Sequence, residues 1–172
     1  RDGSPQQTEK AILLQEPRFR LALSLLINRR AIIDAEYGGS GEAVNLGPGP
    51  GDLGYDPEFL RANIGYEPER ANALLDQIGL TERDSGGFRL YRGKSLSLNL
   101  ICRQGETGLL QFVVEDWEKA GLRVILQEKP HRLFLMEQNN ADLFTAYPGN
   151  ADSWQALGAG AQGPPAVAPA GV

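Results

Sequence analysis

Cysteine and histidine are almost absent from this sequence: Cys102 and His131 are single examples among 172 residues. One cysteine cannot close an intrachain disulfide, and one cysteine with one histidine cannot complete a zinc site. A lone histidine also disfavours hydrolases of the Ser-His-Asp type, and the lack of a converging pair of acids disfavours enzymes that use paired carboxylates. We therefore expect no metal site and a protein that is not an enzyme.

Long apolar runs and clustered cations are missing as well. No stretch approaches the ~18 consecutive apolar residues of a transmembrane helix. Lys and Arg total 17 against 22 Asp and Glu, and the net charge of −5 disfavours nucleic acid as a partner. With 41% hydrophobic and 23% charged residues, the chain has the composition of a globular domain with a core. Because it starts at Arg1 and its one methionine is Met136, we expect a processed or excised chain.

Helical signals dominate the first half of the chain. Residues 17–27 place apolar side chains at helical spacing behind a proline, which suits a first helical turn. Asn28 is a predicted N-cap for a short helix at residues 29–37, and residues 67–78 form a third helical pattern. The apolar run at residues 11–14 fits either an edge strand or a helical turn.

The middle of the chain alternates between strand and helix periods. Residues 95–102 and 122–128 alternate apolar and polar side chains, and residues 142–147 form a short apolar strand. Helical patterns at residues 107–120 and 130–139 separate these strands. Connections of this length favour parallel pairing, so the sequence predicts an α/β fold with a βαβαβ unit.

The same periodicity predicts which side chains pack together. We expect one core between the sheet and its covering helices, formed by Leu98, Leu100, Val113, Trp117, Val124 and Phe144. In the helix at residues 130–139, the predicted packing positions are Leu133, Phe134 and Met136. The acids at positions 115, 116 and 118 are expected to face solvent, because Trp117 takes the inward position.

Two segments are rich in glycine and proline. Residues 38–56 form a long loop, which in a compact domain is usually functional or held against a partner surface. The loop contains a G-x-G-x-x-G match at residues 49–54, but no strand precedes it and Pro50 stiffens it, so we expect no dinucleotide cofactor. Residues 158–172 carry no charge and no period, which predicts a linker or a surface extension.

Ligands of open α/β sheets bind beyond the carboxyl ends of the strands, and polar and aromatic residues follow two of the predicted strands. The candidate ligand-binding residues are Arg103, Gln104, Tyr147, Asn150, Asp152 and Trp154. An aromatic pair with an acid can stack on a ligand and pair with its cationic group. The alternative is that Trp154 packs within the fold and Asp152 caps a turn.

Several motifs resemble one protein family. FRLALSLLINRRAI at residues 19–32 resembles the F-R-x-A-L-S-x-A-I-[DN]-R-x-x-I signature of family 5 extracellular solute-binding proteins, the receptors of ABC importers. YEPERANALL at residues 66–75 and DWEKAGLRV at residues 116–124 are similar to later elements in the same order. The resemblance runs from about residue 19 to residue 154.

This resemblance implies a lobe of the type II periplasmic-binding-protein fold, with a mixed sheet and helices on both faces. It covers only the C-terminal ligand-binding lobe, at residues 17–157, after an N-terminal extension at 1–16 and before the tail at 158–172. The resemblance implies that the N-terminal lobe lies outside this sequence. The implied partners are that lobe, the membrane subunits of an ABC importer, and a small solute that is peptide-like or an oligosaccharide.

The resemblance also assigns a role to one acid. In the family, an aspartate after the last strand of this lobe can hold a peptide's α-amino group, and Asp152 falls at that place. The family's tryptophan before it is out of register, so Tyr147 or Trp154 is expected to replace it. The implied location is periplasmic or extracellular, with a membrane-anchored lipoprotein as one form.

Two other classes of function stay open from the residues alone. The chain could be a protein-interaction domain that docks through the glycine- and proline-rich loop at residues 38–56. An excised enzyme domain is the other alternative, and the single histidine counts against it.

Overall fold

The computed structural model describes residues 5–45, 47–48, 50–105, 107–137, 143–148 and 154–158. The helices in chain order are α1 (Pro5–Gln15), α2 (Pro17–Leu25), α3 (Arg29–Tyr37), α4 (Pro57–Arg61), α5 (Pro68–Gln77), α6 (Thr107–Lys119) and α7 (His131–Glu137). The strands are β1 (Leu90–Tyr91), β2 (Lys94–Ser95), β3 (Ser97–Arg103), β4 (Arg123–Lys129), β5 (Leu143–Pro148) and β6 (Trp154–Gly158).

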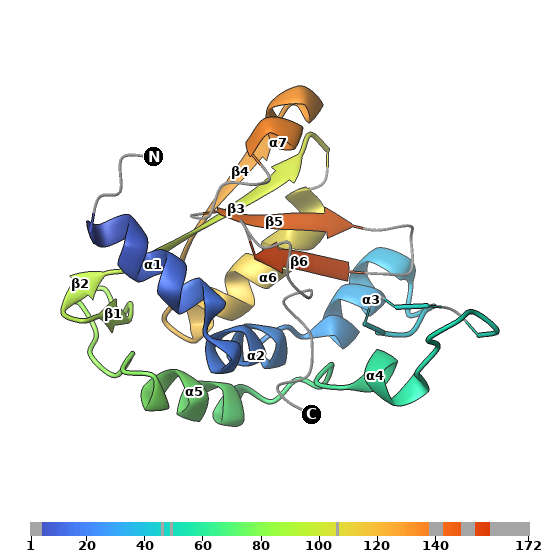
Figure 1. Ribbon diagram of the computed structural model, residues 1–172, viewed down its shortest axis with the longest axis horizontal. Coiled ribbons are helices and arrows are strands. Elements are labelled where there is room, and N and C mark those ends of the chain that lie inside the picture. The colour runs from blue at the N-terminus through green and yellow to red at the C-terminus, as the bar shows by residue number, and fades with distance from the viewer. Residues whose placement is uncertain are drawn as a thin grey trace.

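Four strands form the main sheet, in the order β4-β3-β5-β6 (Figure 1). Strand β3 pairs in parallel with both β4 and β5, which confirms the predicted βαβαβ unit. Strand β6 runs antiparallel to β5, so the sheet is mixed, as expected. The sequence did not predict β6, because its start falls in the acid-aromatic segment and its end in the alanine- and glycine-rich region, where no alternation stands out.

Helices lie on both faces of this sheet. Leu98, Leu100 and Cys102 alternate along β3, are fully buried and belong to the main core with α6. Ile101 points to the opposite face and is also fully buried, and α7, which contacts β3 and β4, carries the buried Phe134. The predicted architecture of a sheet between helices is therefore confirmed.

Trp117 is the largest fully buried side chain among the described residues and is 1% exposed. Its indole Nε1 donates a hydrogen bond of 3.0 Å to the carbonyl of Leu23 in α2, so the ring's one polar group is satisfied inside the core. Of the predicted core residues, those that are buried together are Leu98, Leu100, Val113, Trp117 and Val124. Phe144 lies in β5, and its side chain is outside what the structure describes.

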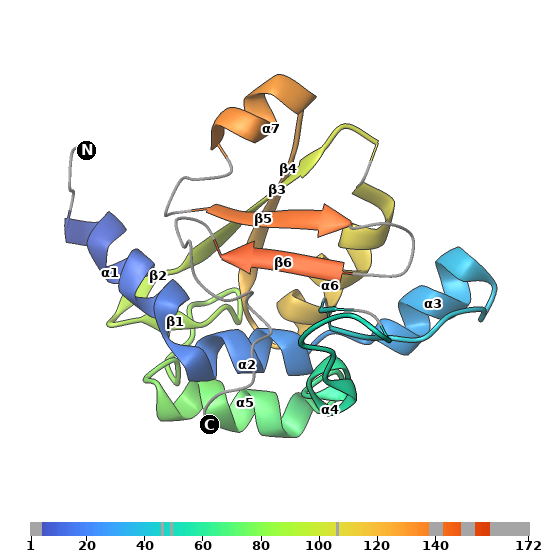
Figure 2. The ribbon, with the colours of Figure 1, turned by 45° about the vertical axis from the view of Figure 1, so that its right-hand side comes forward.

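The helices α2 and α5 pack side by side, and both Figure 1 and Figure 2 show them together below the sheet. Their bounds agree with the predicted helices, and Pro17 and Pro68 stand in their first turns. The N-cap prediction for α3 is confirmed, since Asn28 Oδ1 accepts a hydrogen bond of 3.1 Å from the backbone N–H of Ala31. Gly38 ends this helix at a φ of 59°, a left-handed conformation that favours glycine.

The run at residues 11–14, for which strand or helix was open, lies in helix α1. Leu13 and Leu14 are 2% and 4% exposed and belong to the main core. Glu9 on the same helix forms ion pairs of 3.6 Å with Arg92 and 3.4 Å with Lys94, beside the β1–β2 hairpin. Most of the segment expected as an extension is thus a helix that contributes to the core, and a domain boundary at residue 17 stays a prediction.

The packing expected for α7 was partly wrong. Phe134 is buried, but Leu133 and Met136 are 45% and 70% exposed. Successive residues of an α-helix are separated by about 100°, so a short helix that turns Phe134 to the sheet turns these two positions outward. The helix has 7 residues, too few to present a second buried stripe.

The glycine- and proline-rich loop is held to the lobe by Asn45, which is 4% exposed. Its Nδ2 donates to the carbonyls of Phe59 at 2.7 Å and Ala62 at 2.8 Å, at the end of α4. One anchor of the loop is therefore within the chain itself, and docking of a partner through this loop stays a prediction. The linker or surface extension was predicted at residues 158–172, of which residues 159–172 lie outside the described residues.

Candidate ligand-binding edge and arginine pocket

The parallel strands end together at one edge of the sheet, which we name the carboxyl edge. It comprises the end of β3 at Arg103, the end of β4 at Lys129, the end of β5 at Pro148 and the start of β6 at Trp154. Arg103 is paired in register with Lys129, and the backbone N–H of Gln104 continues the ladder with a hydrogen bond of 3.1 Å to the Lys129 carbonyl. Two cationic residues thus stand on adjacent strands where open α/β sheets bind ligands.

The pairing of β5 with β3 and β6 places the end of β5 and the start of β6 at the carboxyl edge. Ile101 pairs with Thr145, so Arg103 and Tyr147 each lie two residues farther along parallel strands. Across the antiparallel pair, Tyr147 stands opposite Gln155, and Pro148 opposite Trp154. The backbone therefore gathers four of the predicted site residues, namely Arg103, Gln104, Tyr147 and Trp154. The other two, Asn150 and Asp152, lie outside the described residues.

The charges around the carboxyl edge are partly paired. Lys129 Nζ lies 3.3 Å from Glu137 Oε2 of α7, and the Glu128 carboxylate accepts a hydrogen bond from the backbone N–H of Gly105. Gln104 and His131 are exposed beside them. Along the backbone, this edge brings amide, cationic and aromatic residues together. Within the described residues, no cluster of acids, histidines or cysteines could hold a metal ion.

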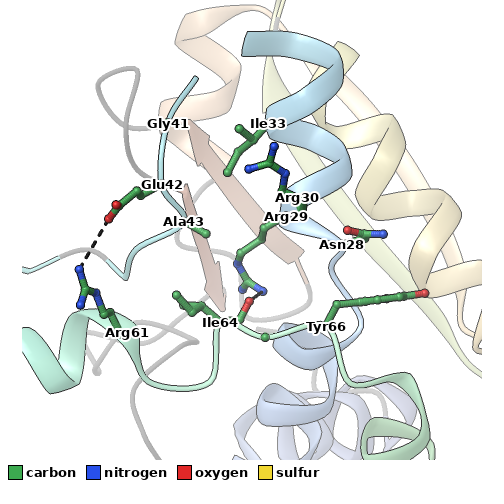
Figure 3. A pocket seen from close by; sticks show the side chains of 11 residues that line it. Asn28, Arg29, Arg30, Ile33, Gly41, Glu42, Ala43, Arg61, Ile64 and Tyr66 are labelled. Carbon is green, nitrogen blue, oxygen red and sulfur yellow. Dashed lines mark hydrogen bonds and ion pairs between the residues drawn. The ribbon is translucent and has the colours of Figure 1, made fainter. Parts of the chain in front are cut away.

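A pocket of about 490 Å³, which we name the arginine pocket, was not anticipated from the sequence. It lies between the first turn of α3, residues 41–43 and residues 61–66, and three arginines line it (Figure 3). Arg29 extends from α3 toward Ile64, between Ala43 and Tyr66 (Figure 3). No periodic pattern marks such a site, because its residues come from a helix start and two loops that only the fold brings together.

Arg29 is the most constrained of the three arginines. Its Nη1 donates to the carbonyl of Ser24 at 2.8 Å and to that of Ile64 at 3.2 Å, and its Nη2 donates to Ser24 Oγ at 2.8 Å. Burial lowers the pKa of Arg29 to about 10, so the side chain stays protonated at neutral pH although it is partly desolvated. The carbonyl of Ser24 lies at the C-terminal end of α2, where helix dipoles favour a positive charge.

Asp116 on α6 lies in a different environment from the one that the sequence predicted. It was expected to face solvent, but it is 7% exposed. Its Oδ2 accepts a hydrogen bond of 2.9 Å from the backbone N–H of Asn28, and its Oδ1 lies 3.0 Å from Lys119 Nζ. Because Asn28 begins α3, this carboxylate fixes the start of the helix that carries Arg29. The prediction failed because residue 116 faces a neighbouring loop and not open solvent.

Residues 7–159 match the model of the bacterial extracellular solute-binding proteins, family 5. The chain belongs to this family. The matched range extends beyond the resemblance seen in the motifs at both ends, since it includes most of α1 and all of β6. The family consists of extracellular solute-binding proteins, which agrees with the prediction of a receptor in place of an enzyme. Among the described residues, no helix is long and apolar enough to cross a membrane.

Several members of the family are similar to this chain. The oligopeptide-binding protein OppA of Lactococcus lactis subsp. lactis (strain IL1403) is 36% identical over 105 residues, or 56% of this chain and 17% of that protein. A solved structure of an oligopeptide-binding protein OppA superposes with a TM-score of 0.68 and 32% identity, covering 74% of this chain and 20% of that one. A mannohexaose-bound oligopeptide-binding protein of Thermotoga maritima superposes at 0.65 with 27% identity, covering 76% and 26%.

These superpositions confirm the type II periplasmic-binding-protein fold. They also show that this chain spans only a fifth to a quarter of the length of the solved structures described above. A family member of full length therefore contains much more protein around the same α/β unit.

Proposed function

We propose that this chain is one lobe of a two-lobed receptor that captures a small solute for an ABC importer, by non-covalent contacts alone. The main support is the carboxyl edge, where the parallel register of β3, β4 and β5 gathers Arg103, Gln104 and Tyr147 on a fold that belongs to a solute-binding family. A second lobe, outside this chain, would close over this edge by a hinge motion.

The proposed solute is an oligopeptide or an oligosaccharide. Similar proteins are named for oligopeptides, and one was solved with mannohexaose. At the proposed site, Tyr147 and Trp154 stack on the solute, Asp152 pairs with a cationic or hydroxyl group, and Arg103, Gln104 and Asn150 supply further polar contacts. The receptor is proposed to work outside the cytoplasmic membrane, with a lipid anchor as one form.

The site needs two lobes for a physical reason. A ligand pocket typically buries ~70–90% of its ligand, and one edge of a sheet cannot do so. Contacts made by half a cleft must still offset the loss of translational and rotational freedom on association.

The solute can be identified by native mass spectrometry of the full-length receptor after gentle purification. We expect a retained peptide or oligosaccharide that leaves on denaturation with its covalent structure intact. In a variant with Tyr147→Ala and Asp152→Ala, the retained fraction should fall, while Glu118→Ala, at an exposed position of α6, should not change it. Cleaved solute, or no retention and no binding of either ligand class, would contradict the proposal.

A further inference from the structure

The arginine pocket carries one positive charge that no carboxylate among the described residues balances. Arg30 Nη2 lies 2.7 Å from Asp34 Oδ1, and Arg61 Nη2 lies 3.7 Å from Glu42 Oε2 (Figure 3 draws the second pair). The polar partners of Arg29 are instead three carbonyls, of Ser24, Ile27 and Ile64, and the hydroxyl of Ser24. The described part of the pocket therefore has an excess charge of one.

The hydrogen bonds of Arg29 leave a particular edge of its guanidinium available. Nη1 uses its two hydrogens on the carbonyls of Ser24 and Ile64, with a longer contact of 3.5 Å to the Ile27 carbonyl, and Nη2 uses one on Ser24 Oγ. Within the described part of the chain, Nε–H and the second Nη2–H have no acceptor. These two groups lie parallel on one side of the guanidinium, and this fork matches the two oxygens of a carboxylate.

The rest of the lining is suited to an apolar group. Ile33, Ala43 and Ile64 line the pocket together with the ring of Tyr66. Its volume of about 490 Å³ falls in the range of small-ligand pockets, which are mostly apolar with a few fixed polar groups. Inorganic anions such as phosphate would leave this apolar lining unfilled.

We propose that the arginine pocket binds a monovalent carboxylate with a small apolar body, which the fork of Arg29 holds through both oxygens. The site is separate from the carboxyl edge and goes beyond the proposed solute-receptor function. All of its described residues belong to this chain, so binding here does not require a second lobe.

The proposal can be tested by two-dimensional NMR on the 172-residue chain, with benzoate as the probe and benzamide as its uncharged analogue. Benzoate should shift the backbone signals of residues 28–30, 41–43 and 64–66 in a saturable way. Benzamide should bind at least about tenfold more weakly, because it cannot accept two charge-assisted hydrogen bonds. Inorganic phosphate should also bind more weakly than benzoate.

Two variants and one control locate the site. Arg29→Lys keeps the charge but removes the fork, and should weaken benzoate binding at least about tenfold. Ala43→Leu fills the pocket without altering Arg29, so it should weaken binding even if Arg29→Lys fails to fold. The control is Ala73→Leu, the same change at an exposed position of α5 outside the pocket, which should leave the affinity unchanged.

Three results would overturn the proposal. The first is the absence of saturable shifts with benzoate in a chain whose spectrum shows that it is folded. The second is equal binding of benzoate and benzamide, or tighter binding of phosphate, which would exclude a carboxylate with an apolar body. The third is unchanged benzoate affinity in folded Ala43→Leu, which would place the binding elsewhere. None of these results bears on solute capture at the carboxyl edge, which the full-length receptor tests.

Discussion

Two neighbouring carbonyls near the end of α2 are satisfied in opposite ways, and the comparison separates folding from recognition. The carbonyl of Leu23 accepts from the indole of Trp117, and the next one, of Ser24, accepts from the guanidinium of Arg29. Trp117 is almost completely buried, and its one polar group, the indole N–H, is part of a large apolar ring system. Arg29 brings a charge to the wall of a pocket and keeps two donors for a ligand.

This difference has an energetic meaning. Burying an indole gains stability from the area removed from water, while its single N–H finds a partner. Desolvating a guanidinium costs free energy and lowers the pKa of Arg29, and hydrogen bonds to the carbonyls of Ser24 and Ile64 hold the charged group at the wall of the pocket. We therefore expect substitutions around Trp117 to change stability, and substitutions at the carboxyl edge and the arginine pocket to change binding.

Trp117→Ala should have the largest effect. Removing a buried aromatic side chain typically costs ~3–5 kcal/mol, and here it also leaves the Leu23 carbonyl without its donor. The free energy of unfolding in urea measures this loss. Trp117→Phe keeps most of the volume and should cost much less. A loss below ~1 kcal/mol for Trp117→Ala would contradict the burial of this side chain in the core, because the cavity left by a buried aromatic ring costs more free energy than that.

Asp152→Ala tests the recognition side of the comparison in the full-length receptor. If the carboxylate meets a buried charge of the solute, the change should weaken binding by ~2–5 kcal/mol and barely alter the melting temperature. Calorimetry and a thermal melt measure both. Unchanged affinity together with a lower melting temperature would show that Asp152 caps a turn, and its assignment to the site would be wrong.

Asp116→Ala should have a smaller effect, on stability. The change leaves the partly buried N–H of Asn28 without an acceptor, which should cost ~1–3 kcal/mol. Glu115→Ala is the control on the same helix, because Glu115 is exposed and surface changes usually stay within ~0.5 kcal/mol. Equal effects of the two substitutions in chemical denaturation would mean that Asp116 does not hold the start of α3.

The smallest effect is expected from Asp84 and should depend on pH. The backbone N–H of Phe88, which donates to Oδ1 at 3.0 Å, lowers the pKa of this carboxyl, and Arg123 at 2.9 Å lowers it further. Because the pKa is lower in the folded state, the charged form adds stability above the unfolded pKa. That contribution is lost as the pH falls through the folded value.

Asp84→Asn removes the charge and keeps an oxygen acceptor. The variant should therefore be less stable than the parent at neutral pH, and the difference should shrink in acid below about pH 4. Urea midpoints at both pH values measure it. A difference that grows toward low pH would have the wrong sign for this carboxylate.

The parts of the fold that follow a simple period were predictable from the sequence. The helix around Trp117 and the strands around Leu98 and Val124 each repeat apolar residues at a fixed spacing, and the structure confirms them. Asn28 was also predictable as the start of a helix, because an N-cap depends on one residue, and the predicted end at residue 37 agrees with the left-handed cap at Gly38.

Features that depend on distant segments were not predictable. The burial of Asp116 requires the backbone of Asn28, which lies 88 positions away in the chain. Likewise, the arginine pocket depends on Ile64 and Ala43 meeting α3, and no local pattern encodes this meeting. Helix α7 was misjudged because three apolar residues within one turn do not reveal which of them faces the sheet.

The candidate site falls between these cases. The parallel order of β3 and β5 followed from chain connectivity, so the meeting of Arg103 and Tyr147 at one edge could be argued in advance. The antiparallel strand that begins at Trp154 was not foreseen, although it places this residue at the same edge. The roles of Asn150 and Asp152 stay predictions.

The central claim is that this chain holds half of a solute site, and calorimetry on two proteins tests it most directly. The solute released from the full-length receptor is titrated into that receptor and, separately, into the 172-residue chain, with folding checked by circular dichroism. We expect tight binding to the receptor and binding to the chain that is at least about a thousandfold weaker, a loss of roughly 4 kcal/mol. A sub-micromolar dissociation constant for the chain alone would contradict the account.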